Sequence, residues 1–375
     1  MKKLLLCIVI AGSLTSCQQI SKWKAQWGSA SAQVEVGMRY ETGDGVDQDY
    51  EEAVSWYQKS ADQGYAEGQY HLGKCYQSGN GLPIDNENAA NLFKKAADQG
   101  YAPAQFEWAL ANENGAGVTS NIETAVKYYK QAADQGFGDA IYRLGLLYYH
   151  GTGVNQNIKQ AFTYFSKAAE QNIIGAIYYL GVCYSDGAGA PQNDKKATEY
   201  FKKAADAGDV SALNKLGERY ENGLGIGMDK KKAFECYEAA AKQDNAEAIY
   251  NLATCYYYGN GVAMDSVKAF KYFEKASEMK IPNATFYLGI CYLEGSGVAK
   301  NTTMGMRYIS SAANQGCIDA KTYMDEYEQY EKEMDAWNNN GGIMVTDLDA
   351  EEAEKRSKEE QERRVNMQTV VRTDY

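Results

Sequence analysis

The chain has few histidines, few prolines and no excess of basic residues. Its 375 residues include two histidines and four prolines, and 38 Lys and Arg stand against 50 Asp and Glu, for a net charge of −12. So few histidines argue against a His-rich metal site or a His-based catalytic relay. The acidic balance argues against a nucleic-acid-binding surface, which needs clustered Lys and Arg. With 45% hydrophobic residues the chain can still build a core, so wholesale disorder is not expected.

Motifs for catalysis and metal binding are also missing from the sequence. There is no Cys-x-x-Cys, which argues against a zinc or redox site. A Ser-x-x-Lys occurs at residues 21–24, before the expected fold, and the Lys-Thr-Gly that accompanies it in penicillin-binding enzymes is absent. Glycine-rich stretches such as Gly223 to Gly227 follow expected helices, whereas a phosphate loop follows a strand. We therefore predict that the protein is not an enzyme and holds neither a cofactor nor a metal.

The N-terminus has the pattern of an export signal. Lys2 and Lys3 precede a short apolar run, Leu4 to Ala11, and about eight residues are too few to span a bilayer, which needs about 20. The run leads to Leu14-Thr15-Ser16-Cys17, which resembles the lipobox of bacterial lipoproteins. The resemblance implies cleavage before Cys17 and its acylation; the alternative is an ordinary signal peptide with a chance cysteine. We expect a signal peptide over 1–16 and a lipid-anchored linker over 17–30.

The same pattern predicts a location. A chain acylated at Cys17 would be lipid-anchored in a bacterial cell envelope. Gln18 and Gln19 follow the cysteine without an Asp, which in some lineages accompanies sorting to the outer membrane. We therefore favour the outer membrane over the inner membrane.

A 36-residue repeat occupies most of the chain. Gly-x-Gly recurs eight times in constant register, and the first glycines are Gly43, Gly79, Gly115, Gly151, Gly187, Gly223, Gly259 and Gly295. Positions in the repeat are counted from this glycine. Position −11 is Ala or Gly, position −7 is mostly Leu, position −6 is Gly or Ala, and position −3 is Tyr in seven copies. These spacings place one stripe along an α-helix, and the small residues at −6 predict close approach by a neighbouring helix.

A second helix is expected after each Gly-x-Gly. Position +6 is always Asp or Asn, the residues favoured at a helix N-cap: Asp49, Asp85, Asn121, Asn157, Asn193, Asp229, Asp265 and Asn301. The helix then ends at a glycine suited to a left-handed cap in five copies. Asn172 can fill that role in another copy, whereas Asp244 and Lys280 fit it less well.

These patterns predict an all-α fold. We expect an α-solenoid of eight 36-residue helix–turn–helix repeats over residues 31–330, because a single hairpin cannot bury its apolar faces and stacking can. Its last piece, 316–330, would be a terminal capping helix. We expect residues 331–375 to form a charged, flexible C-terminal tail, whose role stays open.

The repeat resembles the Sel-one-like repeat (SLR) family, a branch of the tetratricopeptide-repeat-like solenoids. The residues that carry the resemblance in the fourth copy are Ala140, Leu144, Gly145, Tyr148, Gly151, Gly153, Val154, Asn157, Ala161, Tyr164, Phe165, Ala168 and Ala169. The resemblance implies a right-handed superhelix that acts as an adaptor or binding scaffold, and it does not imply a ligand.

The cysteines beyond Cys17 leave disulfides open. Cys75, Cys183, Cys255 and Cys291 share position −4 and are expected to be buried small hydrophobic residues. Equivalent positions in adjacent repeats lie too far apart to bond. Some family members pair cysteines between helices, and Cys236 and Cys255 could meet in this way. The sequence does not decide which of Cys75, Cys183, Cys236, Cys255, Cys291 and Cys317 form disulfides.

In related solenoids the first helices line the concave face, which places positions −9, −5 and −2 in a binding groove. The predicted groove residues are Tyr70, Phe106, Leu110, Tyr142, Leu146, Tyr149, Tyr178, Val182, Tyr250, Tyr257, Phe286 and Ile290. Tyrosine suits binding because it offers rigid area with a polar tip. The alternative is that these rings only pack on one another.

Together these features predict a non-catalytic, membrane-anchored repeat scaffold that mediates protein–protein interaction in the bacterial cell envelope. Its partner would be a protein or peptide, its contact with the membrane would be the N-terminal lipid alone, and it would bind no nucleic acid. The alternative is a glycan-binding lipoprotein, because an aromatic groove also suits sugar rings.

Overall fold

The computed structural model describes residues 15–339, and side chains are described for 21–332. Every regular element in that range is a helix, which confirms the all-α prediction. The first helices of the eight repeats are α3 (Ala30–Thr42), α5 (Ala66–Ser78), α7 (Ala102–Asn114), α9 (Gly138–His150), α11 (Ile174–Asp186), α13 (Val210–Asn222), α15 (Ala246–Tyr258) and α17 (Pro282–Glu294). The second helices are α4 (Tyr50–Asp62), α6 (Asn86–Asp98), α8 (Ile122–Asp134), α10 (Ile158–Glu170), α12 (Asp194–Asp206), α14 (Lys230–Ala241), α16 (Ser266–Glu278) and α18 (Thr302–Asn314).

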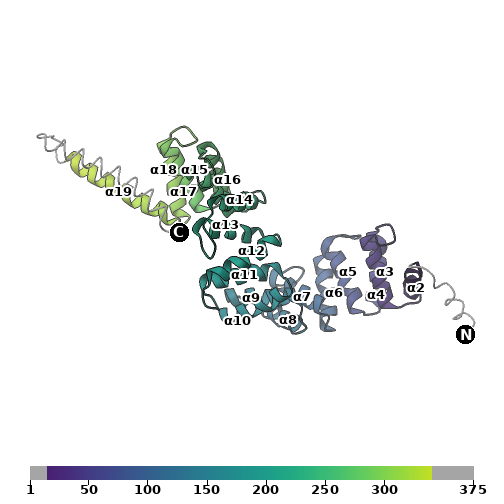
Figure 1. Ribbon diagram of the computed structural model, residues 1–375. Coiled ribbons are helices and arrows are strands. Elements are labelled where there is room, and N and C mark those ends of the chain that lie inside the picture. Colours follow the sequence, from purple (N-terminus) through teal and green to yellow (C-terminus); the bar gives the residue numbers. More distant parts are fainter. Residues whose placement is uncertain (1–14, 340–375) are drawn as a thin grey trace, which may run out of the picture. The chain divides into compact units, whose positions relative to one another are not determined.

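The chain divides between Asp209 and Val210 into two compact units. Unit 1 holds the first five repeats and unit 2 holds the last three (Figure 1). Within each unit, a first helix packs against the second helix of its own repeat, and that second helix packs against the next first helix. Each hairpin therefore buries its apolar faces against its neighbours, as stacking of repeats requires.

The turn between the two helices of a repeat is built as predicted. In the fourth repeat, Gly151 is left-handed with a φ of 72°, and its N–H donates to the carbonyl of Leu147. The side chain of Asn157 then caps α10 by accepting from the backbone N–H of Gln160. All eight predicted Asp and Asn residues are N-caps of their second helices. Asp244 and Lys280, which suit the cap at the end of a second helix poorly, still adopt it, with φ values of 56° and 64°.

The small residues at position −6 allow the two helices of a repeat to approach closely. A Cβ added at Gly145 would lie 2.6 Å from the ring of Phe165, which is fully buried at position +14. Five further repeats place a glycine in the same way against their own position +14 side chain. The predicted close approach is therefore confirmed, and the element that approaches is the second helix of the same repeat.

The segment expected to be a linker is in part a packed helix. Helix α2 (Thr15–Gln26) contacts α3, and Ala25 is buried with Ala32, Val36 and Trp56. The side-chain amide of Gln33 donates to the carbonyl of Ala25 at 3.2 Å. The prediction that residues 21–24 lie outside any fold is therefore wrong, because the first repeat offers α2 an apolar face to cover. Cys17 lies in α2, and its side chain is not among those described.

The C-terminal helix is also longer than predicted. Helix α19 (Ile318–Asn339) begins as the expected capping helix and runs beyond residue 330. Residues 1–14 of the predicted signal peptide and residues 340–375 of the predicted tail lie outside the described residues. Across residues 15–339, no helix has both the length and the apolar composition needed to cross a membrane.

Six cysteines carry free thiols in the structure: Cys75, Cys183, Cys236, Cys255, Cys291 and Cys317. The four at position −4 are buried, as predicted. Burial raises the pKa of the Cys75 and Cys255 thiols to about 12, so both stay protonated at neutral pH. These cysteines are packing residues of the core.

Candidate binding surface on the first helices

The predicted groove rings are anchored by the second helices. In five repeats the ring at position −9 contacts the ring 23 residues later, as in Tyr142–Phe165, where the ring centroids are 6.1 Å apart. Ten of the twelve predicted residues are half-buried. Tyr250 and Phe286 are 8% and 4% exposed and belong to the core of unit 2, so their prediction as groove residues is corrected. Phe286 packs against Tyr323 of α19, which lies outside the repeats.

The largest accessible group of rings lies on α9 and α11 in unit 1. Tyr142, Tyr149 and Tyr178 surround Tyr179, with centroid distances of 6.2, 5.5 and 5.4 Å to that ring. All four side chains are half-buried, and we refer to them as the tyrosine cluster. Burial raises the pKa of Tyr142 to about 12, so its hydroxyl stays protonated and can donate a hydrogen bond. The cluster offers rigid aromatic area with polar tips.

Tyr179 is the member that the sequence analysis missed. It stands at position −8, next to the groove positions, and stacks on Phe165 of the preceding repeat with centroids 4.9 Å apart. His71 stacks on Tyr57 and Tyr287 stacks on Phe273 in the same way. An aromatic residue at position −8 therefore predicts a ring that stacks on the position +14 ring of the preceding repeat.

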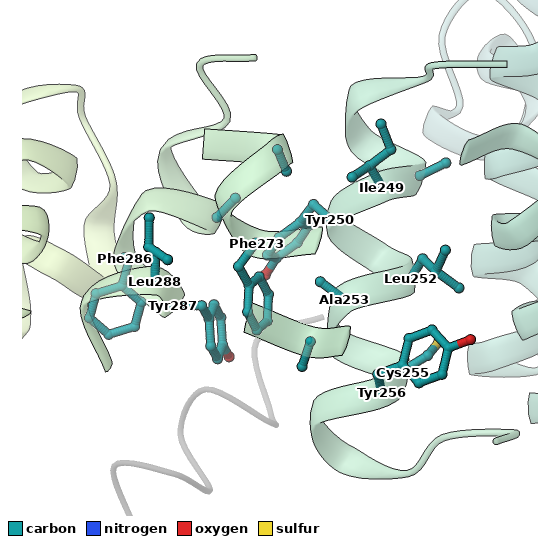
Figure 2. Close-up of a cluster of buried hydrophobic side chains, with 14 of the residues drawn as sticks. Ile249, Tyr250, Leu252, Ala253, Cys255, Tyr256, Phe273, Phe286, Tyr287 and Leu288 are labelled. Carbon is teal, nitrogen blue, oxygen red and sulfur yellow. The ribbon is translucent and has the colours of Figure 1, made fainter. Parts of the chain in front are cut away.

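In unit 2 the equivalent rings are less available for binding, because their faces or their hydroxyls already have partners. Figure 2 shows Tyr287 packed beside Phe273 and Phe286, and Tyr287 is only 5% exposed. Its hydroxyl lies 3.0 Å from that of Tyr258, and the hydroxyl of Tyr257 donates to Glu294 at 2.7 Å. The polar tips of these tyrosines therefore have partners inside the protein.

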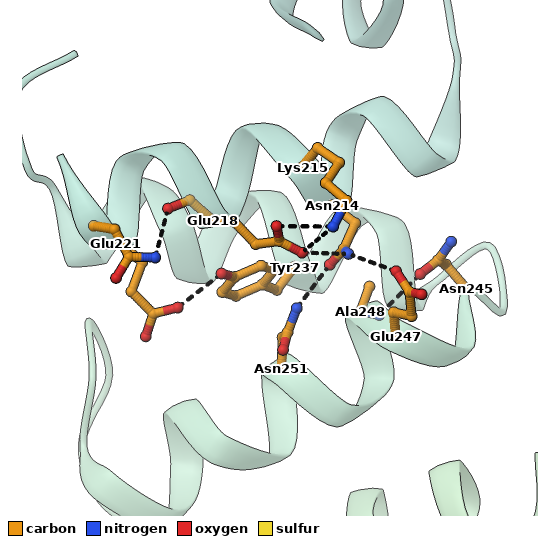
Figure 3. Close-up of polar contacts among 10 residues, drawn as sticks. Asn214, Lys215, Glu218, Glu221, Tyr237, Asn245, Glu247, Ala248 and Asn251 are labelled. Atoms are coloured by element: carbon orange, nitrogen blue, oxygen red, sulfur yellow. Dashed lines mark hydrogen bonds and ion pairs between the residues drawn. The ribbon is translucent and has the colours of Figure 1, made fainter. Parts of the chain in front are cut away.

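At position −9 the sixth repeat carries a polar side chain, where six of the other repeats carry a ring. Asn214 at position −9 is 1% exposed, and its side chain donates to Glu218 and accepts from Asn251 (Figure 3). Glu218 at position −5 also pairs with Lys215 at 3.0 Å. These bonds are made among the residues of unit 2 themselves.

The early repeats carry ion pairs on their first helices. Lys74 contacts Glu107 at 2.8 Å, and Arg143 makes two hydrogen bonds to Glu113 at 2.8 and 2.9 Å. A bidentate Arg–carboxylate pair has fixed geometry. These charged side chains of the first helices are therefore paired with one another. Within the predicted groove, Tyr142, Tyr149 and Tyr178 gather around one further ring, and Leu146 and Val182 lie at position −5 of the same two helices.

A second pattern missed at the sequence level links the two helices of a repeat. Position +14 is Tyr in three repeats, and in each of them position −2 is Glu. The hydroxyls of Tyr57, Tyr129 and Tyr237 donate to Glu41, Glu113 and Glu221 at 2.5, 2.6 and 2.8 Å. The other five repeats have Phe or Ile at +14 and no Glu at −2. Glu at −2 therefore supplies the acceptor that a buried hydroxyl needs.

The described residues offer little for chemistry beyond binding. Within residues 21–332, no group of three His, Cys, Asp or Glu side chains is arranged to hold a metal ion. The thiols of the core are buried and protonated.

Comparison with known structures supports this architecture. The chain is 32% identical, with a TM-score of 0.67 over 81% of its length, to c5321, a protective antigen of uropathogenic Escherichia coli strains displaying an SLR fold; the match spans 65% of that chain. It is 25% identical, with a TM-score of 0.58, to a Sel1 repeat protein from Oxalobacter formigenes, over 86% of this chain and 93% of that one. No curated protein matches the chain in sequence.

Eight consecutive segments match the Sel1 repeat. They are residues 30–65, 66–101, 102–137, 138–173, 174–209, 210–245, 246–280 and 282–317. Proteins built from this repeat are generally protein-interaction scaffolds and typically non-catalytic. The matched segments cover most of the chain, and the protein belongs to the Sel1 repeat family.

Proposed function

We propose that this protein is a lipoprotein of the bacterial cell envelope, anchored through Cys17, and that its tyrosine cluster binds a polypeptide partner. The scaffold role follows the family, and the anchor rests on the lipobox-like Leu14 to Cys17. Gln18 and Gln19 favour the outer membrane as the site of the anchor.

The observation that carries the binding site is the tyrosine cluster itself. Its four half-buried rings come from two adjacent first helices, and the centroids of three of them lie within 6.2 Å of the centroid of Tyr179. Because Phe165 and Phe201 hold these rings from below, they would lose little conformational freedom on binding. Tyrosine is enriched among residues that dominate protein interfaces for this reason.

The partner should present apolar or aromatic side chains with hydrogen-bond acceptors beside them. Leu146 and Val182 supply aliphatic area on the same two helices, and the hydroxyl of Tyr142 can supply a donor. A polypeptide segment combines both kinds of group along its length.

A pull-down from detergent-solubilised envelopes tests this proposal. The bait is the full chain, compared with Tyr142→Ala/Tyr178→Ala. The matched control is Tyr148→Ala/Tyr184→Ala, which removes two tyrosines of the same repeats that stack on the second helices instead. A specific protein retained by wild type and control but lost by the cluster variant supports the proposal. Glycan-array binding without a protein partner would overturn it in favour of the glycan-binding alternative.

A further inference from the structure

Helix α2 has two different faces. Ala25 is 1% exposed and packs on the first repeat, and the hydroxyl of Ser21 donates to Glu35 at 2.7 Å. Trp23 and Trp27 are 49% and 77% exposed, with ring centroids 5.7 Å apart. One face of α2 is therefore docked on the protein while two adjacent tryptophans stand in solvent.

Among the tryptophans whose side chains the structure describes, these two differ from the rest. Trp56 and Trp108 are 6% and 7% exposed, as expected for a side chain with so much apolar area. Adjacent exposed large apolar side chains mark an interaction surface more often than isolated ones do. Trp23 in α2 and Trp27, which directly follows the last residue of α2, therefore form a candidate contact surface.

The charge around the two tryptophans indicates which occupant. Lys22 and Lys24 flank Trp23 and are exposed, and residues 15–29 contain no Asp or Glu, although the chain as a whole carries a net charge of −12. Tryptophan and lysine are the residues that favour the membrane–water interface, where the ring lies at headgroup level and the ammonium meets phosphate. A second copy of this chain would bring like-charged lysines together on the same face, which disfavours self-association.

The position of α2 in the chain agrees with a membrane. Cys17 lies six residues before Trp23 in the same helix. At a rise of 1.5 Å per residue the separation along the axis is about 9 Å. Acyl chains on Cys17 would hold this helix at the bilayer surface, within reach of the headgroup layer.

We propose that α2 docks on the lipid bilayer through Trp23 and Trp27, with Lys22 and Lys24 on anionic headgroups. This inference rests on the proposed anchoring and adds a second membrane contact to it. Because α2 is packed on α3, the docked helix would fix the orientation of the first repeat relative to the membrane surface. A lipid anchor alone would leave that repeat free to turn.

The test measures where the two tryptophans lie. The acylated full chain is reconstituted into vesicles of phosphatidylethanolamine and phosphatidylglycerol with brominated acyl chains, which quench nearby indole fluorescence. We expect quenching in the wild type and its loss in Trp23→Phe/Trp27→Phe. The control Trp56→Phe/Trp108→Phe removes two buried tryptophans and should keep the quenching. Vesicle-bound protein whose Trp23 and Trp27 are not quenched would overturn the proposal.

A second arm separates docking from anchoring. The mature chain beginning at residue 17 with Cys17→Ser cannot be acylated at that cysteine, so its sedimentation with the same vesicles reports α2 alone. Lys22→Gln/Lys24→Gln should weaken that binding by roughly 30-fold, from about 1 kcal/mol per lysine near an anionic surface. Trp23→Ser/Trp27→Ser should weaken it by on the order of tenfold or more. If the wild-type protein proves to be unacylated and the Cys17→Ser chain still binds the vesicles with quenched tryptophans, the proposed lipid anchor is wrong and the proposed docking of α2 is supported. If Trp23→Ser/Trp27→Ser abolishes self-association of the chain and leaves vesicle binding unchanged, the face belongs to a contact with a second copy and the proposal is overturned.

Discussion

The buried Tyr–Glu pairs allow a quantitative test of how the repeat is held together. Tyr237 is fully buried, and its hydroxyl donates to Glu221 at 2.8 Å. Burial raises the pKa of this tyrosine well above its usual range, so the hydroxyl remains a donor. Glu221→Ser should cost about 1–3 kcal/mol, because it leaves a buried hydroxyl without an acceptor. Tyr237→Phe should cost about 1 kcal/mol, because the partly exposed carboxylate regains water.

The double variant Tyr237→Phe/Glu221→Ser reproduces the pair that the fifth repeat uses, Phe201 with Ser185. Its cost should be close to that of Tyr237→Phe alone, so the coupling free energy should equal the cost of Glu221→Ser, about 1–3 kcal/mol. Hydrogen exchange of the α13 and α14 amides measures the local opening free energy in each variant. Additive costs in the double variant would refute the reasoning. So would a Glu221→Ser variant as stable as the wild type.

Three further predictions follow. Gly117→Ala should lower the stability of unit 1 by at least about 2 kcal/mol in urea unfolding, because its φ is 70° and a Cβ would lie 1.9 Å from the carbonyl oxygen of Asn86. Gly136 is also left-handed, but no atom lies within 4 Å of its added Cβ, so the control Gly136→Ala should cost only about 1 kcal/mol. Burial lowers the pKa of His71 below its unfolded value of about 6.5, so the unfolded chain binds more protons and unit 1 should lose stability as the pH falls from 7 to 5. His71→Phe should remove that slope in urea midpoints measured at both pH values, and an unchanged slope would contradict the assignment. Cys17→Ala should abolish metabolic labelling with palmitate, because the proposed acylation site is removed; continued labelling would locate acylation elsewhere.

The sequence predicted what depends on one repeat and missed much of what depends on two elements. Turn glycines and N-caps such as Asn157 act within a few residues of the chain, so residue type and spacing were enough to predict them. The burial of Phe286 depends on Tyr323 of α19, which lies outside the repeats and could not be read from the period. The packing of α2 involves Ala25, the one buried residue among the α2 side chains that the structure describes, in a segment without a repeat.

The structure narrows the predicted groove to fewer accessible rings, and their role in binding stays a prediction. Positions −9 and −2 identified Tyr142, Tyr149 and Tyr178, but not Tyr179, because a ring at −8 acts on the preceding repeat and not on its own. Nor could position alone separate the accessible Tyr142 from the buried Tyr250, since neighbouring repeats decide which rings are covered.

The most direct test of the proposed function is photo-crosslinking in intact cells. Tyr178 is replaced by the photoreactive p-benzoylphenylalanine, and the same residue placed at Tyr184, which stacks on Tyr200, serves as the matched control. We predict that irradiation yields one dominant polypeptide adduct from position 178 and none from position 184. Equal adducts at both positions, or none at 178, would contradict a polypeptide-binding role for the tyrosine cluster.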